Sequence, residues 1–188
     1  MLNQVYIFLL DALLQPFAAL LLLRFHLQWL RAPLRNPLGE FVMAFTDFLV
    51  LRARRFIPSA RGLDSASLLL ACVVEVIYLA ALLWAQDYPY LSFPLYALLA
   101  WAGVKLLRIS FYLLMVALFA QAVLSWVNPH TRMAALLDAV TRPFLMPLRR
   151  RIPLFGNVDV APLVLLIVCQ LILILPLGWL ETLALRML

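Results

Sequence analysis

Residues 46–75 read TDFLVLRARRFIPSARGLDSASLLLACVVE, and residues 141–170 read TRPFLMPLRRRIPLFGNVDVAPLVLLIVCQ. The two segments align without a gap at a separation of 95 positions, and 10 of the 30 aligned residues are identical. The identical polar and turn residues pair Thr46 with Thr141, Arg54 with Arg149, Arg55 with Arg150, Pro58 with Pro153, and Asp64 with Asp159. A 188-residue chain with one such duplication is built from two copies of one supersecondary unit.

The amino-acid composition indicates that much of the chain is surrounded by lipid. Apolar residues make up 66% of the sequence and charged residues 13%, whereas soluble domains have about half apolar and a quarter charged residues. A water-soluble core cannot absorb this excess, so the sequence predicts an all-α integral membrane protein.

Four apolar runs are long enough to cross a bilayer of about 30 Å. We expect spans near 5–30, 65–86, 106–127 and 162–183, with 95–104 as a short helical lead-in to the third. The predicted division is a first repeat at 1–87, an interfacial aromatic and proline linker at 88–104, and a second repeat at 105–188. The first run has no basic start and carries Asp11, so it does not resemble a cleavable signal peptide.

The arginines predict the orientation. Six basic residues fall between the first two predicted spans and five between the last two. Short loops rich in arginine lie in the cytoplasm, and four spans allow both loops to do so. We therefore expect a multi-pass protein of the bacterial inner membrane with both termini in the periplasm.

Each basic loop also carries an apolar helical stripe. The stripe of the first loop contains Phe41, Phe45, Phe48 and Leu49, and that of the second contains Met133, Leu136, Leu137, Val140 and Phe144. An apolar stripe beside clustered arginines is typical of a helix in the membrane interface. The arginines expected to contact anionic headgroups or a partner protein are Arg54, Arg55, Arg149, Arg150 and Arg151.

Polar residues inside the predicted spans are candidates for function, because each is costly to keep there. The candidates are Asp11, Arg24, Glu75 and Gln170. Aligning Trp29 with Trp126, at a separation of 97, places Asp11 over Arg108 and Arg24 over Gln121. Such groups either line a hydrated pathway between the repeats or make interhelical hydrogen bonds, with Arg24 reaching toward the interface. We expect Glu75 to be protonated or to pair with a group such as Gln170.

Asp64 and Asp159 each precede a predicted span, where an aspartate can cap the helix N-terminus. Pairing with the arginines of the same loop is compatible with that role. The alternative is an acidic cation site at the mouth of a pathway. Thr46, Thr141, Pro58 and Pro153 are expected to shape the same turns.

Motifs for enzymatic chemistry are missing from the sequence, so we expect no catalytic residue, metal or cofactor. Cys72 and Cys169 lie in apolar runs and are expected to be buried, unbonded hydrophobic residues. Arginine-rich loops could also contact nucleic acid, but no stacking surface or recognition fold accompanies them, so the sequence disfavours this partner.

The duplicated motif resembles the YggT family of small bacterial and plastid membrane proteins. The residues that carry the resemblance are Arg24, Trp29, Thr46, Arg54, Arg55, Pro58 and Asp64 in the first copy, and Ser125, Trp126, Thr141, Pro143, Arg149, Arg150, Pro153, Asp159 and Pro162 in the second. The first copy departs from the second at Gln28, Phe48 and Ser67, and the second has Gln121 in place of Arg24. The resemblance implies links to osmotic or ion homeostasis, to cell division, or to the assembly of membrane complexes.

The sequence is compatible with two functions. The first is a non-enzymatic membrane assembly or organising factor that docks a partner protein through its arginine-rich amphipathic loops. The alternative is a small channel or osmotic component that uses polar groups between the repeats. Because four spans rarely enclose a pore alone, the alternative requires a homo-oligomer.

Overall fold

In the computed structural model, the described residues are 2–57, 64–86, 94–127, 131–151 and 159–187. They form seven helices and no strand: α1 (Leu2–Trp29), α2 (Pro37–Ala53), α3 (Ser65–Ala85), α4 (Leu95–Val127), α5 (Arg132–Arg149), α6 (Ala161–Ile174) and α7 (Pro176–Arg186). The predicted all-α fold is confirmed.

Four helical stretches have the length and composition to cross a membrane, at Asn3–Trp29, Ser65–Ala85, Leu95–Leu124 and Ala161–Arg186. The third differs from its prediction, because 95–104 is the start of one continuous helix rather than a separate lead-in. No proline or glycine pair interrupts this region, so nothing breaks the helix. The fourth comprises α6 and α7, which are separated at Leu175 because Pro176 cannot donate a backbone hydrogen bond.

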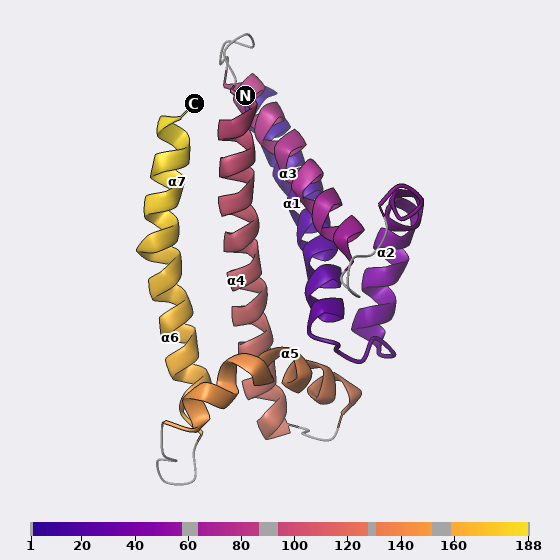
Figure 1. The fold of residues 1–188 in the computed structure, drawn as a ribbon, viewed down its shortest axis with the longest axis vertical. Coiled ribbons are helices and arrows are strands. Elements are labelled where there is room, and N and C mark those ends of the chain that lie inside the picture. The colour runs from indigo at the N-terminus through magenta and orange to yellow at the C-terminus, as the bar shows by residue number, and fades with distance from the viewer. Residues whose placement is uncertain (1, 58–63, 87–93, 128–130, 152–158, 188) are drawn as a thin grey trace.

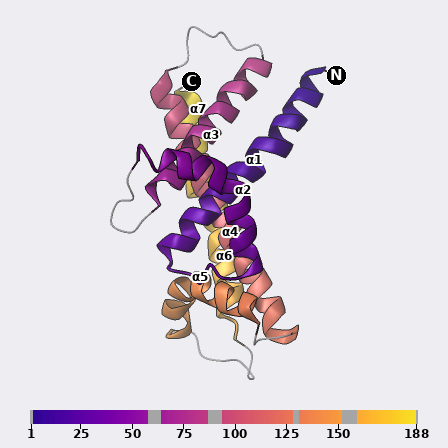
Figure 2. The ribbon, with the colours of Figure 1, turned by 90° about the vertical axis from the view of Figure 1, so that its right-hand side faces the viewer.

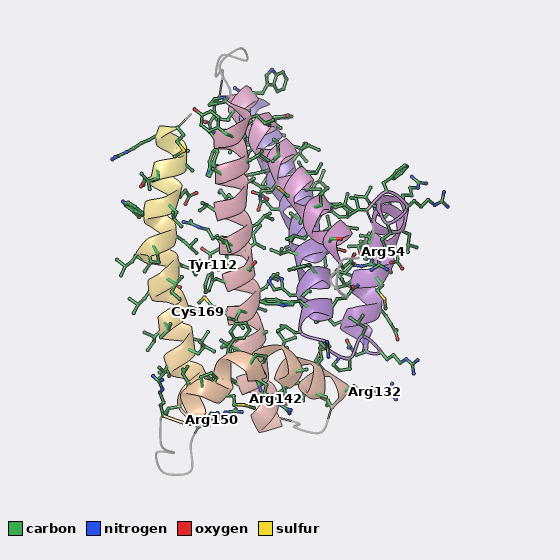
Figure 3. The ribbon with its side chains drawn as sticks, viewed as in Figure 1. Arg54, Tyr112, Arg132, Arg142, Arg150 and Cys169 are labelled. Carbon is green, nitrogen blue, oxygen red and sulfur yellow. The ribbon has the colours of Figure 1, made fainter. Side chains whose placement is uncertain are left out.

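The four long stretches run alternately up and down, and the two termini lie at the same end (Figure 1). Because α1 and α4 both run away from this end, both short helices begin near the opposite end, which we call the basic end. Helix α2 then runs back beside the bundle, so Arg54 lies well away from Arg150 (Figure 3). There α5 lies across the bundle, whereas α2 stands beside α1 and α3 (Figure 1). Viewed from the side, α1 crosses the bundle obliquely (Figure 2).

Small and branched apolar residues fill the contact between α1 and α3. Ala18 and Leu21 of α1 are fully buried with Ala71 of α3 in one cluster. Small residues let membrane helices approach closely, which supplies the packing that the hydrophobic effect cannot supply within lipid. A second cluster joins Leu118 of α4 to Leu165 and Cys169 of α6.

The short helices α2 and α5 both begin with an N-cap residue whose side chain accepts a backbone hydrogen bond. The side chain of Asn36 accepts a hydrogen bond from the N–H of Gly39 at 2.9 Å, and Thr131 accepts one from the N–H of Ala134 at 3.1 Å. Asn36 and Thr131 are 95 positions apart, so the duplication extends upstream to both helix starts. Glycine is required at position 39, because a Cβ there would lie 2.3 Å from the backbone oxygen of Leu34.

Candidate functional site

The duplicated arginines close both basic turns in the same way. In the first repeat, Nη2 of Arg54 lies 2.8 Å from Oδ2 of Asp64. In the second, Nε of Arg149 lies 2.7 Å from Oδ2 of Asp159. Each pair joins the end of a short helix to the start of a span ten positions later. The repeat therefore encodes one ion pair in each copy.

The second arginine of each duplicated pair behaves differently from the first. Arg55 and Arg150 are exposed and make no ion pair with any residue that the structure describes. Arg150 only approaches the sulfur of Met146, at 3.8 Å. Figure 3 shows Arg132, Arg142 and Arg150 spread along α5, which presents its positive charge outward. The duplication thus pairs one structural arginine with one outward arginine.

Arg24 is the centre of a buried polar cluster in the first repeat. Its side chain is 4% exposed, and Nη1 lies 2.7 Å from both Oγ1 of Thr46 and Oδ1 of Asp47. Its Nε also donates to Asp64, at 3.3 Å. Arg24 therefore ties α1 to α2 and to the start of α3, and it does not extend toward the interface as one interpretation of the sequence had it.

Asp64 lies at the N-cap position of α3, but its carboxylate makes no capping hydrogen bond. The predicted capping bond is thus wrong for Asp64, because Arg24, Arg54 and the hydroxyl of Ser67, at 2.6 Å, occupy the carboxylate. Burial acts to raise the pKa of Asp64, but hydrogen bonds from Arg54 and Ser67 and the charges of both arginines outweigh it and hold the pKa below its ordinary value. Asp159 instead accepts a hydrogen bond from the N–H of Ala161 at 3.1 Å, in addition to its ion pair with Arg149.

The second repeat replaces the charged cluster with a neutral contact. The hydroxyl of Thr141 hydrogen-bonds to Gln121, the residue that occupies the place of Arg24. Thr46 and Thr141 are both fully buried and both contact the first span of their own repeat. The position is therefore conserved in geometry between the repeats but not in charge.

Of the residues predicted to form an intramembrane site, Asp11 and Glu75 both lie at the contact between α1 and α3, whereas Gln170 does not join them. The hydroxyl of Tyr78 donates to Asp11 at 2.6 Å, and the amide of Gln15 donates to Glu75 at 3.2 Å. These contacts lie between α1 and α3, within the first repeat. Gln170 is exposed on α6, so its predicted pairing with Glu75 is wrong. The alignment of the repeats pointed to Gln170, whereas Gln15 carried no signal beyond its polarity.

A second intramembrane polar cluster joins α4 to α7. Glu181 lies 2.5 Å from Nη2 of Arg108 and 3.8 Å from Nζ of Lys105. The indole N–H of Trp101 donates to the same carboxylate at 3.5 Å. Sequence reasoning did not join these residues. The spacing of Lys105 and Arg108, three apart on one helix face, was the available signal.

A groove of about 600 Å³ lies between the two repeats at the basic end. It is bounded by α1, α4, α5 and Leu38 of α2, and its walls are apolar apart from His26, Trp29 and Ser110. None of the paired intramembrane acids lines it. This groove between the repeats is therefore apolar.

The two predicted amphipathic stripes have different neighbours. Phe41 and Phe45 of α2 are 48% and 52% exposed, with their ring centroids 4.6 Å apart. Leu136 of α5, which occupies the place of Phe41, is 1% exposed. Phe144 is partly buried and lines the groove.

Pro58 and Pro153 lie outside the described residues. Among the residues that are described, no group of histidine, cysteine, aspartate or glutamate could hold a metal ion. Cys72 and Cys169 are free thiols, with Cys169 buried between α6 and α4.

The fold and these clusters define a multi-pass helical membrane protein made of two tandem repeats, each with two spans joined by a short helix and an arginine–aspartate turn. A family description, CCB3/YggT, matches residues 3–85 and 100–180, one segment for each repeat. The chain belongs to the CCB3/YggT family.

Curated relatives cover nearly the whole chain. Uncharacterized protein PA0392 of Pseudomonas aeruginosa is 32% identical over 173 residues, covering 91% of this chain and 87% of the relative. Uncharacterized protein YggT of Escherichia coli is 30% identical over 168 residues, covering 88% and 85%. A Vibrio alginolyticus protein in the proC 3' region is 32% identical over 165 residues, covering 87% and 88%. No solved structure matches the chain.

Proposed function

We propose that the chain is a non-enzymatic organising factor of the bacterial inner membrane that docks an acidic partner protein on its basic end. The observation that carries the proposal is the division of labour within each duplicated arginine pair. Arg54 and Arg149 close the turns, which leaves Arg55 and Arg150 with no folding role that the described contacts reveal. Two copies of one outward arginine, one at the C-terminal end of each short helix, suit surfaces that recognise a complementary charge pattern.

The surrounding chemistry supports the same placement. Under the positive-inside rule the basic end faces the cytoplasm. There, Arg132, Arg142 and Arg151 add to the charge beside the anionic leaflet, and each arginine near such a surface contributes about 1 kcal/mol of attraction. The partner would be a factor of the envelope, of division or of complex maturation.

The test compares outward with structural arginines in a strain that depends on the chain. Replacing Arg55 and Arg150 with glutamine should leave the thermal unfolding midpoint unchanged and reduce complementation of the deletion at least tenfold. A photo-crosslinker placed at Arg150 should capture one defined protein, and the same label at Trp179 of α7 should not. The matched control is Arg54→Gln with Arg149→Gln, which should lower the unfolding midpoint. Full complementation by the outward pair of substitutions would overturn the proposal.

The channel or osmotic alternative makes the opposite prediction. It places function on Glu75, whose carboxylate is buried and bonded to Gln15. The alternative would be favoured if potassium flux into proteoliposomes exceeded the flux into empty vesicles and was lost in the Glu75→Gln variant. Absence of flux from folded, inserted protein, together with full complementation by Glu75→Gln, would exclude a role for this group in ion passage.

A further inference from the structure

The groove between the repeats is long and narrow. Its wall on α4 extends from Leu107 to Leu124, which corresponds to about 26 Å at about 1.5 Å per residue. A volume of about 600 Å³ over this length gives a mean cross-section of about 23 Å². An α-helix with its side chains is about 10 Å wide and needs about 80 Å². The groove therefore has room for one extended hydrocarbon chain and not for a helix of a second copy or of another protein.

The groove is open to the surface of the bundle. Leu107 and Val116 of its α4 wall are 50% and 66% exposed, and Trp29 of its α1 wall is 51% exposed. All three residues belong to helical stretches with the length and composition to cross a membrane. An apolar surface at this depth meets acyl chains, and it gains close packing contacts when a chain fills it.

The polar side chains in the walls are already satisfied within their own helices. Nδ1 of His26 donates to the backbone oxygen of Leu22 at 2.7 Å. The hydroxyl of Ser110 donates to the backbone oxygen of Leu106 at 2.8 Å. Water needs two to four polar partners to stay in such a space, and these walls supply few. The chemistry of the walls therefore favours hydrocarbon as the occupant.

Two exposed arginines flank the groove at the basic end. Arg31 directly follows Leu30, which lines the groove. Arg132 directly precedes Met133, which lines it as well. The two segments meet, because Met133 packs against the apolar cluster that contains Ala32. Within the part of the chain that the structure describes, neither arginine forms an ion pair, so both guanidinium groups can bind an anion.

We infer that the groove binds one acyl chain of an anionic phospholipid from the leaflet at the basic end, with the lipid phosphate on Arg31 and Arg132. Arginine forms charge-assisted, two-pronged hydrogen bonds with phosphate. A zwitterionic phospholipid carries an ammonium group beside its phosphate, so it gains less from two cations. Trp29 belongs to the same end of the groove, and indole rings anchor at the level of the headgroups. The inference does not depend on the docking role of Arg55 and Arg150, which follow the other ends of α2 and α5.

Photolabelling in proteoliposomes tests the inference. The full-length chain is inserted into vesicles of phosphatidylglycerol and phosphatidylethanolamine in equal amounts, and a trace of one of the two lipids carries a diazirine on its acyl chain. Labelled phosphatidylglycerol should modify residues 23–30 and 107–124 at least fivefold more than labelled phosphatidylethanolamine. The double variant Arg31→Gln with Arg132→Gln should reduce this labelling to the level of phosphatidylethanolamine.

The matched control for the arginines is Arg55→Gln with Arg150→Gln. It removes the same charge from exposed positions away from the groove, so it should leave the labelling unchanged. Equal labelling by the two lipids, with no effect of the Arg31→Gln and Arg132→Gln substitutions, would overturn the inference. The groove would then be filled by bulk lipid without selection.

A variant that fills the groove tests the place of the acyl chain. Ala117 lines the groove, so Ala117→Phe should reduce the labelling by phosphatidylglycerol at least fivefold. Ala100→Phe is the control, because Ala100 is exposed on α4 outside the groove, and it should leave the labelling unchanged. Labelling that survives Ala117→Phe would overturn the inference, since the chain would then lie elsewhere on the bundle.

Discussion

Nε of Arg24 lies 3.3 Å from Oδ2 of Asp64, a residue 40 positions further along the chain. Both side chains are buried, at 4% and 1% exposure. Because Asp64 also binds Arg54, and Arg24 also binds Asp47, two acids and two bases neutralise one another where α1, α2 and α3 meet. These ion pairs hold α1, α2 and the start of α3 together as one unit.

Arg24→Gln introduces the residue that the second repeat carries at this position. It leaves Asp47 and the buried Asp64 short of a partner, and breaking a buried pair of this kind costs about 3 kcal/mol. We expect a lower unfolding midpoint in detergent micelles. Arg142→Gln is the control, because Arg142 is exposed and pairs with Asp138 within one helix, an interaction of about 0.5 kcal/mol at most. Equal losses for the two variants would contradict a structural role for Arg24.

The stability of the first repeat should fall at acid pH. The folded pKa of Asp64 is held below its ordinary value of 3.8, so its ionised form stabilises the fold above that pH. As pH falls below this value and through the folded pKa, the unfolded chain takes up a proton first and the stabilisation is lost. Unfolding midpoints measured from pH 6 to pH 3 should converge for the wild type and Asp64→Asn. A constant difference across the range would exclude this linkage.

Arg31 occupies a backbone conformation that suits glycine, with φ of 51°. It follows α1, where the N–H of Ala32 bonds to Leu27 and that of Arg31 bonds to Gln28, which is the Schellman arrangement. Arg31→Gly should therefore stabilise the protein by about 1 kcal/mol, seen as a raised unfolding midpoint. Arg35→Gly, at a residue with negative φ, should give no gain. Loss of complementation by the stabilised Arg31→Gly variant would show that the arginine itself is used at the basic end.

The sequence predicted the architecture well because its signals were local. Hydropathy indicated the spans, and the internal repeat indicated two equivalent turns in which Arg54 corresponds to Arg149. The pairings inside the bundle were not predictable in the same way. Whether Glu75 meets Gln15 or Gln170 depends on which helices are neighbours and on their rotation, and neither quantity is encoded in the periodicity of one helix.

The difference in exposure between Phe41 of α2 and Leu136 of α5 was also out of reach. Phe41 and Leu136 are both apolar and occupy matching positions, so the alignment treats them alike. Only the three-dimensional order of the repeats leaves the first exposed and the second covered. A tandem repeat has two ends, and the sequence does not say which face the ends leave open.

The carboxylate of Glu181 is the common ion-pair partner of two cations. Lys105 and Arg108 both point to it from α4, and all three lie in spanning segments. Glu181→Gln would leave two positive charges near each other in a low-dielectric region, whereas Arg108→Gln would leave a balanced pair of Lys105 and Glu181. We therefore expect Glu181→Gln to lower the unfolding midpoint more than Arg108→Gln, by about 1 to 2 kcal/mol in equivalent stability. Adding Arg108→Gln to Glu181→Gln should recover part of the loss. If the double variant were less stable than Glu181→Gln alone, repulsion between the two cations would not be the cause.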